Sequence, residues 1–186
     1  MPPPPAARAK VLRAFAELLV ESGERSATLE AVAERAGVSK GGLLYHFPSK
    51  DALVDGLLDH LGVLTAADVE AMRTAPEGAS DYLLRTSTVI GGEFEVVYLA
   101  ASRVAQGASP RARAVLDDAQ AAWTAAVQDE LGDPVLARAV SLMGEGLYAL
   151  ASVGASGPTD HEIDELLTLV RETAAARGGG GEVGEG

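Results

Sequence analysis

The stretch TLEAVAERAGVSKGGLLYHFPSK, residues 28–50, decides the fold of this chain. Thr28 precedes a run of apolar residues at helical spacing, and its side-chain oxygen can accept from an unpaired backbone N–H at a helix start. Gly37 can adopt the left-handed conformation that follows a helix end. Ser39 then caps a second helix of about two turns, expected over residues 40–46. The stretch therefore predicts two short helices joined by a tight turn.

The end of the stretch predicts a further boundary. Phe47-Pro48 ends the second helix, because proline disfavours the helical region for the residue before it. Ser49 is a third capping residue and predicts the start of a longer helix. Three capped starts around a glycine-centred turn, within 23 residues, have the spacing of a helix-turn-helix unit.

The second helix of this unit has an unusual composition for a surface helix. Gly41 and Gly42 each weaken it by roughly 1 kcal/mol relative to alanine. That cost is explained if the backbone must approach a partner closely. Polar aromatic residues and flanking cations complete the segment: Tyr45, His46, Lys40 and Lys50. Such a helix suits contact with the phosphates and base edges of DNA.

The segment GVSKGGLLYHFPSKDAL, residues 37–53, resembles the DNA-binding signature of the TetR family of bacterial transcriptional regulators. The resemblance is close over residues 7–60, and beyond them it extends to the order and length of the helices. It implies an all-α protein with an N-terminal three-helix DNA-binding domain that contains the helix-turn-helix. A larger helical domain for ligand binding and dimerisation follows. We expect a head at residues 1–50, a body at 51–177 and a disordered glycine-rich tail at 178–186.

Two positions of the second helix depart from the family. Gly42 stands where the family usually has threonine, and Leu44 where it usually has a tyrosine that touches a backbone phosphate. The next two positions often hold aromatic or histidine residues in the family, as they do here. The residues that we assign to DNA binding are Thr28, Ser39, Lys40, Gly41, Gly42, Leu44, Tyr45, His46 and Lys50.

Composition excludes several classes of protein. The chain has 186 residues and no cysteine, so it has neither a disulfide framework nor a thiolate metal site. It contains no run of about 18 apolar residues that would span a membrane. Its N-terminus, MPPPPAARAK, lacks the apolar region of a signal peptide. We expect a cytoplasmic protein that needs no cofactor or metal.

The charge is unevenly distributed along the chain. The net charge of −12, taken alone, argues against nucleic-acid binding. Residues 1–50, however, hold seven Lys and Arg against five Glu, a net +2, so the remaining residues carry −14. A mildly basic head on an acidic body is consistent with DNA binding by the head alone. We expect modest non-specific affinity for DNA with a strong dependence on salt.

The body continues with helical spacing. Residues 51–73 predict one long helix, and the next is expected from Asp81 through Val89 and Ile90 to a break at Gly91-Gly92. The tetrapeptide GGEF at residues 91–94 spells the active-site signature of diguanylate cyclases. That chemistry needs a strand hairpin, and no alternating pattern predicts one here. A break between two body helices is the interpretation that we adopt.

The last two predicted helices are the candidate homodimer interface. The helix at residues 134–153 is apolar on more than one face and must be covered on more than one side. Together with the last helix, capped by Thr159, it would form a four-helix bundle with a second copy, as in the family. The alternative is that this face packs inside its own domain. Two heads would bind a palindromic operator with half-sites roughly 34–36 Å apart or a multiple of this.

The resemblance implies a pocket in the body for an unknown small-molecule effector. Scarce aromatic and sulfur-containing side chains are the candidates to line it: Met72, Tyr82, Phe94, Tyr98, Trp123, Met143 and Tyr148. The alternative is that they are ordinary core residues.

The expected function is that of a homodimeric repressor released from its operator by the effector. An enzyme is not expected, because the three histidines lie in separate elements and no nucleophile-base pair has an informative spacing. The alternative is a helical scaffold or adaptor of the same fold that no longer binds DNA.

Overall fold

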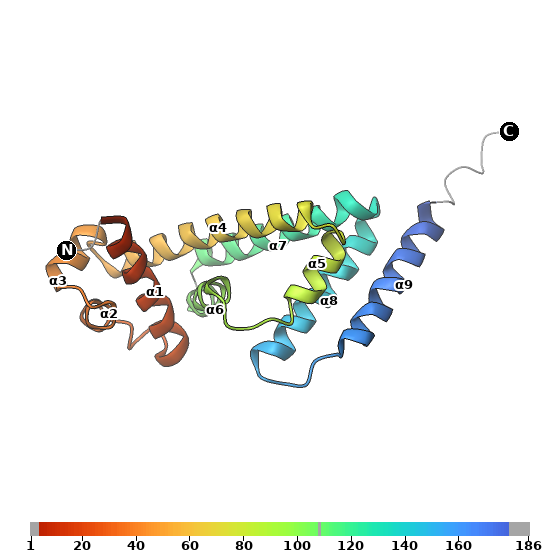
Figure 1. The fold of residues 1–186 in the computed structure, drawn as a ribbon. Coiled ribbons are helices and arrows are strands. Elements are labelled where there is room, and N and C mark those ends of the chain that lie inside the picture. Colours follow the sequence, from red (N-terminus) through yellow and green to blue (C-terminus); the bar gives the residue numbers. More distant parts are fainter. Residues whose placement is uncertain (1–3, 108, 179–186) are drawn as a thin grey trace. The chain divides into compact units, whose positions relative to one another are not determined.

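The computed structural model of the protein describes residues 4–107 and 109–178. These residues form nine α-helices and no strand (Figure 1), which confirms the all-α prediction. Among them, no helix combines the length and the apolar character needed to cross a bilayer. The helices are α1 Pro4–Ser22, α2 Leu29–Ala36, α3 Lys40–His46, α4 Lys50–Thr74, α5 Ala79–Thr86, α6 Glu93–Gln106, α7 Pro110–Leu131, α8 Pro134–Ser152 and α9 Asp160–Gly178.

The helices form two compact units. Unit 1 comes from Met1–Ala66 and Gly91–Asp118, and unit 2 from Ala67–Ile90 and Ala119–Gly186. Helices α4 and α7 therefore contribute residues to both units. The division into a head at 1–50 and a body at 51–177 is a functional one and stays a prediction. The tail predicted at 178–186 lies outside the described residues, except for Gly178 at the end of α9.

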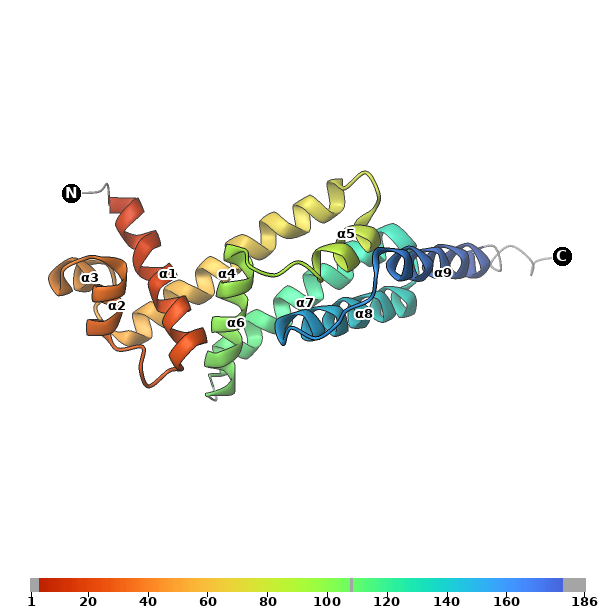
Figure 2. The same ribbon diagram turned by 60° about the horizontal axis from the view of Figure 1, so that its bottom comes forward.

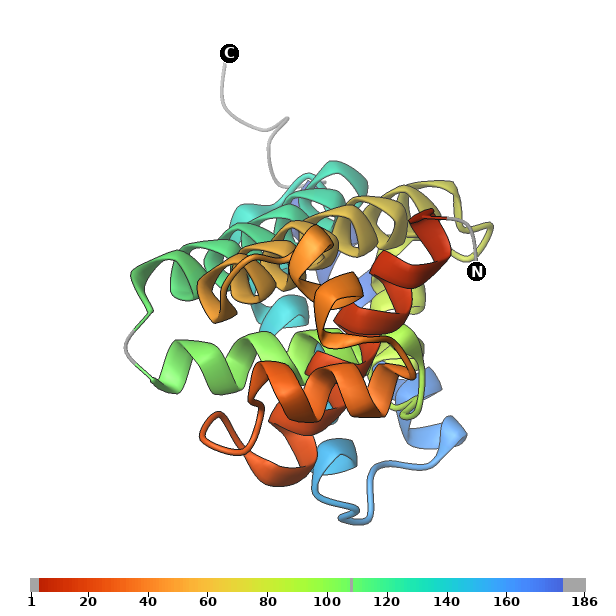
Figure 3. The same cartoon turned by 90° about the vertical axis from the view of Figure 1, so that its left-hand side faces the viewer.

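Unit 1 is built around α1. Val11, Phe15 and Leu19, at helical spacing on α1, are fully buried. α1 packs against α2, α3 and α6, and α1 to α3 face the viewer in Figure 3. The apolar core of the unit joins the three N-terminal helices to the first half of α4 and to α6. The predicted head therefore shares one core with segments of the predicted body.

Unit 2 is built around contacts of α5 with α8 and α9, which lie together in Figure 2. Ion pairs reinforce the α5–α9 contact, because Asp81 of α5 binds Arg171 of α9 at 3.3 Å and Arg85 of α5 binds Asp164 of α9 at 2.5 Å. Asp81 is buried and also pairs with Arg85 at 2.7 Å.

The predicted end of the helix that begins near Asp81 is wrong. α5 ends at Thr86, and Val89 and Ile90 lie in an exposed loop rather than on a buried stripe. The hydroxyls of Ser87 and Thr88 donate to the carbonyls of Leu83 and Arg85 at 2.7 and 2.8 Å. These bonds satisfy carbonyls at the end of the helix and compete with its continuation.

Candidate nucleic-acid interface

The helix-turn-helix forms as the capping residues predict. The hydroxyl of Thr28 accepts from the backbone N–H of Ala31 at 3.2 Å and starts α2. Gly37 ends α2 with φ +66°, the left-handed conformation that glycine adopts at low cost. Its N–H donates to the carbonyls of Ala33 and Glu34.

α3 is held in place from one side only. The hydroxyl of Ser39 caps it by accepting from the N–H of Gly42 at 3.0 Å. Leu43 is fully buried, and Phe47, which follows the helix in an extended conformation, is buried beside it in the core of unit 1. These two anchors fix which face of α3 points outward.

The outward face of α3 carries large side chains next to empty positions. Tyr45 is 83% exposed and Leu44 is 36% exposed. A Cβ atom added at Gly41 would meet nothing within 4 Å, and one at Gly42 would meet only the hydroxyl of Ser39, at 3.2 Å. The fold of the free chain therefore does not require glycine at residue 41, where alanine would stabilise a helix.

The two lysines of the predicted site are engaged within the protein. Lys40 donates from Nζ to Oε1 of Glu30 at 2.5 Å, and this hydrogen bond lowers the pKa of the Glu30 carboxyl. Lys50 donates to the backbone carbonyl of Glu24 at 2.5 Å, and the Glu24 carboxylate lies 3.9 Å away. Each ammonium has three N–H donors, so a phosphate at either lysine would share the group with these partners and compete with the nearby carboxylate for its charge.

Three arginines of α1 and α2 also have partners within the protein. Arg35 forms an ion pair with Glu21 at 2.8 Å, and Arg13 forms one with Glu17 at 2.9 Å. Arg8 lies over the ring of Phe47, with its guanidinium carbon 5.3 Å from the ring centroid. The Arg13–Glu17 pair follows from i,i+4 spacing on α1. The pairing of Arg35 and the position of Arg8 could not be predicted from the sequence, because their partners lie on other elements.

The residues predicted to line an effector pocket divide between the two units. Phe94 and Tyr98 belong to unit 1 and stack along α6, with ring centroids 6.0 Å apart. The other five, Met72, Tyr82, Trp123, Met143 and Tyr148, belong to unit 2.

Within unit 2, Asp68 of α4 brings two of the predicted residues together. It accepts from the hydroxyl of Tyr82 at 3.0 Å and from Nε1 of Trp123 at 2.8 Å. Burial and the negative charge of Asp68 raise the pKa of Tyr82 to about 12. Sequence reasoning missed Asp68, since nothing in its local context separates it from the other acidic residues of α4.

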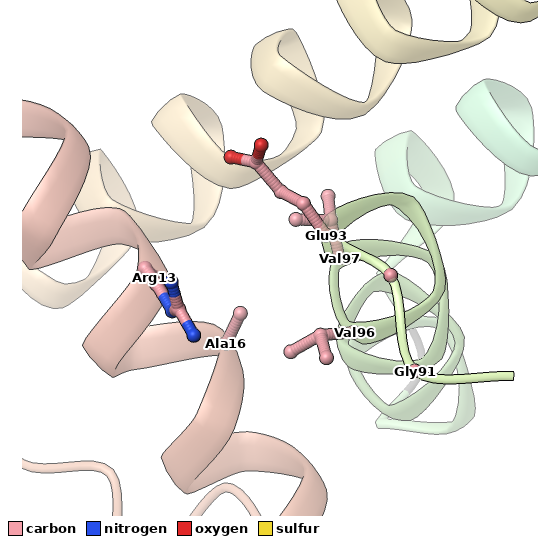
Figure 4. Close-up of a pocket in the computed structure, with 7 residues that line it drawn as sticks. Arg13, Ala16, Gly91, Glu93, Val96 and Val97 are labelled. Carbon is pink, nitrogen blue, oxygen red and sulfur yellow. The ribbon is translucent and has the colours of Figure 1, made fainter.

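A cavity of about 210 Å³ lies in unit 1 between α1 and the start of α6 (Figure 4). Arg13 reaches it from α1 and Glu93 from α6, and the other lining residues are Ala16, Gly91, Gly92, Val96 and Val97. Glu93 also lies 3.0 Å from Nε2 of His60 on α4. The start of α6 is thus tied to α4 and incompletely packed against α1.

Family models match most of the chain. The model for bacterial regulatory proteins of the tetR family matches residues 11–57. The model for the tetracyclin repressor-like C-terminal domain matches residues 82–175, which is half of the chain.

Curated relatives match less than half of the chain. The HTH-type transcriptional repressor KstR2 of Rhodococcus jostii (strain RHA1) is 34% identical over 103 residues, covering 44% of this chain and 50% of KstR2. The HTH-type transcriptional regulator BetI of Escherichia coli O45:K1 is 30% identical over 89 residues, covering 47% of this chain and 45% of BetI. The chain thus spans about half the length of the curated relatives that it matches.

Solved structures match over nearly the whole chain. The multidrug binding protein EbrR, complexed with malachite green, superposes with a TM-score of 0.65 at 26% identity, covering 88% of this chain and 96% of that one. A TetR-family regulator from Rhodococcus sp. superposes with a TM-score of 0.66 at 21% identity, covering 90% and 98% of the two chains, and shows a shared fold.

Proposed function

The chain belongs to the TetR family of bacterial regulatory proteins, and we propose that it is a homodimeric repressor that a small-molecule effector releases from operator DNA. The observation that carries this proposal is the outward face of α3. That face is anchored from behind by Leu43 and Phe47 and presents Tyr45, Leu44 and the unfilled position at Gly41. We place the protein in the cytoplasm, where bacterial DNA lies, and we propose no catalytic activity for it.

In this proposal α3 enters the major groove and α2 supports it. The polar and cationic residues at the two ends of α3 contact the DNA backbone, which sets the position of the helix but carries no base sequence. The exposed residues in the middle of α3 contact base edges. The full set remains as assigned from the sequence: Thr28, Ser39, Lys40, Gly41, Gly42, Leu44, Tyr45, His46 and Lys50.

The ion pairs of the head add a condition to DNA binding. A phosphate at Lys40 competes with the carboxylate of Glu30, and one at Lys50 competes with that of Glu24, for the charge of the ammonium group. Both pairs are at least partly exposed, so the cost of this exchange is small. Each phosphate contact releases counterions and makes the affinity fall with salt. We therefore expect weak non-specific binding and a strong salt dependence.

A second copy of the chain is the proposed partner for the exposed side of α8. Apolar and small residues recur there at helical spacing and remain exposed: Val135, Leu142, Gly146, Ala149, Leu150 and Val153. A Cβ atom at Gly146 would meet nothing within 4 Å, so a partner helix can approach closely there. On α9, Leu169 is exposed as well. A dimer through α8 and α9 would cover these residues and present two heads to a palindromic operator.

The proposed effector site includes the carboxylate and aromatic groups around Asp68. EbrR is described in complex with malachite green, which is an aromatic cation. Asp68 offers a negative charge between Tyr82 and Trp123, and such a group suits a ligand of this class. Malachite green is therefore the first compound to test.

Helix α6 is the proposed route from the effector to the head. It packs on α1 in one compact unit and carries the stacked pair Phe94 and Tyr98. The cavity beside Arg13 leaves room for the start of α6 to shift against α1. An effector that binds more tightly to the arrangement with low DNA affinity shifts the protein towards that arrangement. The size of the effect is set by the difference between the effector's binding free energies for the two arrangements.

The decisive experiment is selection of bound fragments from a genomic DNA library by the purified protein at about 0.15 M salt. We expect one or a few inverted repeats to be enriched. A folded dimer that enriches no sequence, with or without candidate effectors, would instead favour a helical scaffold that no longer binds DNA.

A further inference from the structure

The outward face of α3 has a gap beside an apolar side chain. Residues three and four positions apart are neighbours on a helix surface, so the side chains of Leu44 and Tyr45 flank the position of Gly41 one turn back. Side chains on a helix lean towards its N-terminus, which directs Leu44 over that turn. Because Gly41 has no side chain and a Cβ atom there would meet nothing within 4 Å, the backbone of residue 41 forms the floor of a small notch with Leu44 as one wall.

The packing of the head does not account for Leu44. Its neighbour Leu43 is fully buried and anchors α3, whereas Leu44, about 100° further round the helix, is 36% exposed. A single exposed leucine is common on protein surfaces. What distinguishes Leu44 is the empty position next to it on the face that the proposed function directs at DNA. Leucine also lacks the hydroxyl with which the usual tyrosine of the family contacts a phosphate at this position, so that contact is not available to it.

The chemistry of the major groove limits what this notch can contact. Leucine has no hydrogen-bonding group, so placing it against a polar base edge would leave donors and acceptors of that base unpaired. The thymine C5 methyl is the apolar group that the four bases present in the major groove. The nearest charged side chain on α3, Lys40, is held by Glu30 at 2.5 Å and does not fill the notch.

We propose that Leu44 and the gap at Gly41 form a specificity-determining site that takes the methyl group of one thymine in each operator half-site. This inference rests on the proposed function, since it needs α3 in a major groove. It goes beyond that function by naming the residues that read the sequence and the base that they read.

The test begins with a random-sequence duplex library, from which the full-length protein selects a preferred duplex at about 0.15 M salt. Each thymine of that duplex is then replaced singly by deoxyuridine, which pairs as thymine does but lacks the methyl group. We expect one thymine per half-site whose replacement weakens binding by about fourfold, the factor for one methyl group withdrawn from water. Replacing both should weaken it by about fifteenfold.

Two variants assign the effect to the notch. Leu44→Ala removes its wall and Gly41→Ala fills it, so each should bind the thymine and deoxyuridine duplexes about equally. The open space at residue 41 lets Gly41→Ala fold, which circular dichroism can verify. Lys50→Ala is the control, because loss of a phosphate contact should weaken binding to both duplexes and keep the ratio between them.

The outcomes separate the inference from the function on which it rests. A duplex that binds tightly and tolerates deoxyuridine at every thymine would overturn the inference and leave the repressor proposal intact. The same conclusion would follow if the thymine preference survived unchanged in Leu44→Ala. If no duplex is retained at all, the proposed function fails and the notch fails with it.

Discussion

Glu30 in the first turn of α2 holds Lys40, the first residue of α3, by a hydrogen bond of 2.5 Å between Oε1 and Nζ. The bond crosses the turn of the helix-turn-helix and lowers the pKa of the Glu30 carboxyl. It keeps the carboxylate charged and close to the face proposed to meet DNA. Glu30 therefore opposes the binding of a phosphate near Lys40.

Removing that carboxylate should strengthen binding to DNA. We expect Glu30→Gln to raise affinity for all DNA sequences and to steepen the fall of log K with log salt by about 0.9 per head, the value for one more phosphate contact. Binding measured over a series of salt concentrations checks this. Glu34→Gln is the control, since it removes the same charge from the same helix without touching Lys40. Equal effects of the two substitutions would show that the Glu30–Lys40 pair has no specific role.

An acidic substitution on the exposed side of α8 should separate the dimer. Leu142→Glu places a charge that a partner helix would have to bury, which is costly without a counter-ion. We expect a folded monomer in analytical ultracentrifugation with greatly reduced affinity for a duplex that holds both half-sites. Val63→Glu, at an exposed valine of α4, introduces the same change elsewhere and should remain dimeric. If the Leu142→Glu protein remains dimeric, the interface does not include this part of α8.

Binding of malachite green should be visible at Trp123, the single tryptophan of the chain. Because Trp123 donates to Asp68 at 2.8 Å, a cation bound there should change its fluorescence, and Asp68→Asn should abolish most of the response. By linkage, operator DNA and the dye should weaken each other's binding by the same factor. Asp129→Asn, on the same helix as Trp123, is the control. A response that survives in Asp68→Asn would place the dye elsewhere.

Acid should destabilise unit 2 through the caps of α8 and α9. Hydrogen bonds from the backbone of Leu136 and Val135, with the charge of Arg177, hold the pKa of Asp133 below its ordinary 3.8. A hydrogen bond from the backbone N–H of Thr159 holds the pKa of the Glu162 carboxyl below its ordinary 4.5. Since both folded pKa values are depressed, the stabilisation is present above pH 4.5 and is lost as pH falls through the folded values.

Thermal unfolding followed by circular dichroism tests the contribution of the α8 cap. The melting temperature should fall between pH 6 and pH 3. In Asp133→Asn it should fall less over that range, because asparagine can still cap the helix but does not titrate. An identical pH dependence in the wild type and in Asp133→Asn would mean that other carboxylates account for the acid effect.

Local rules predicted much of the helix-turn-helix. Thr28, Gly37 and Ser39 act within three or four residues of their own positions, so their caps and turn follow from the adjacent sequence. The end of α5 was missed for a related reason. The hydroxyls of Ser87 and Thr88 compete for the last carbonyls of α5, while the apolar spacing of Val89 and Ile90 suggested that the helix continued.

The helical class, the capped helix-turn-helix and the family of the chain could all be predicted before the structure was known, because they depend on neighbouring residues and their spacing. Tertiary structure decided which charges are paired and which aromatic groups meet. Lys40 forms an ion pair with Glu30 across a turn, and Trp123 donates a hydrogen bond to Asp68, which lies 55 residues earlier in the chain. Such contacts depend on how helices pack, and many packings share one pattern of apolar residues. The notch at Gly41 is likewise visible only once Leu43 shows which face of α3 is buried.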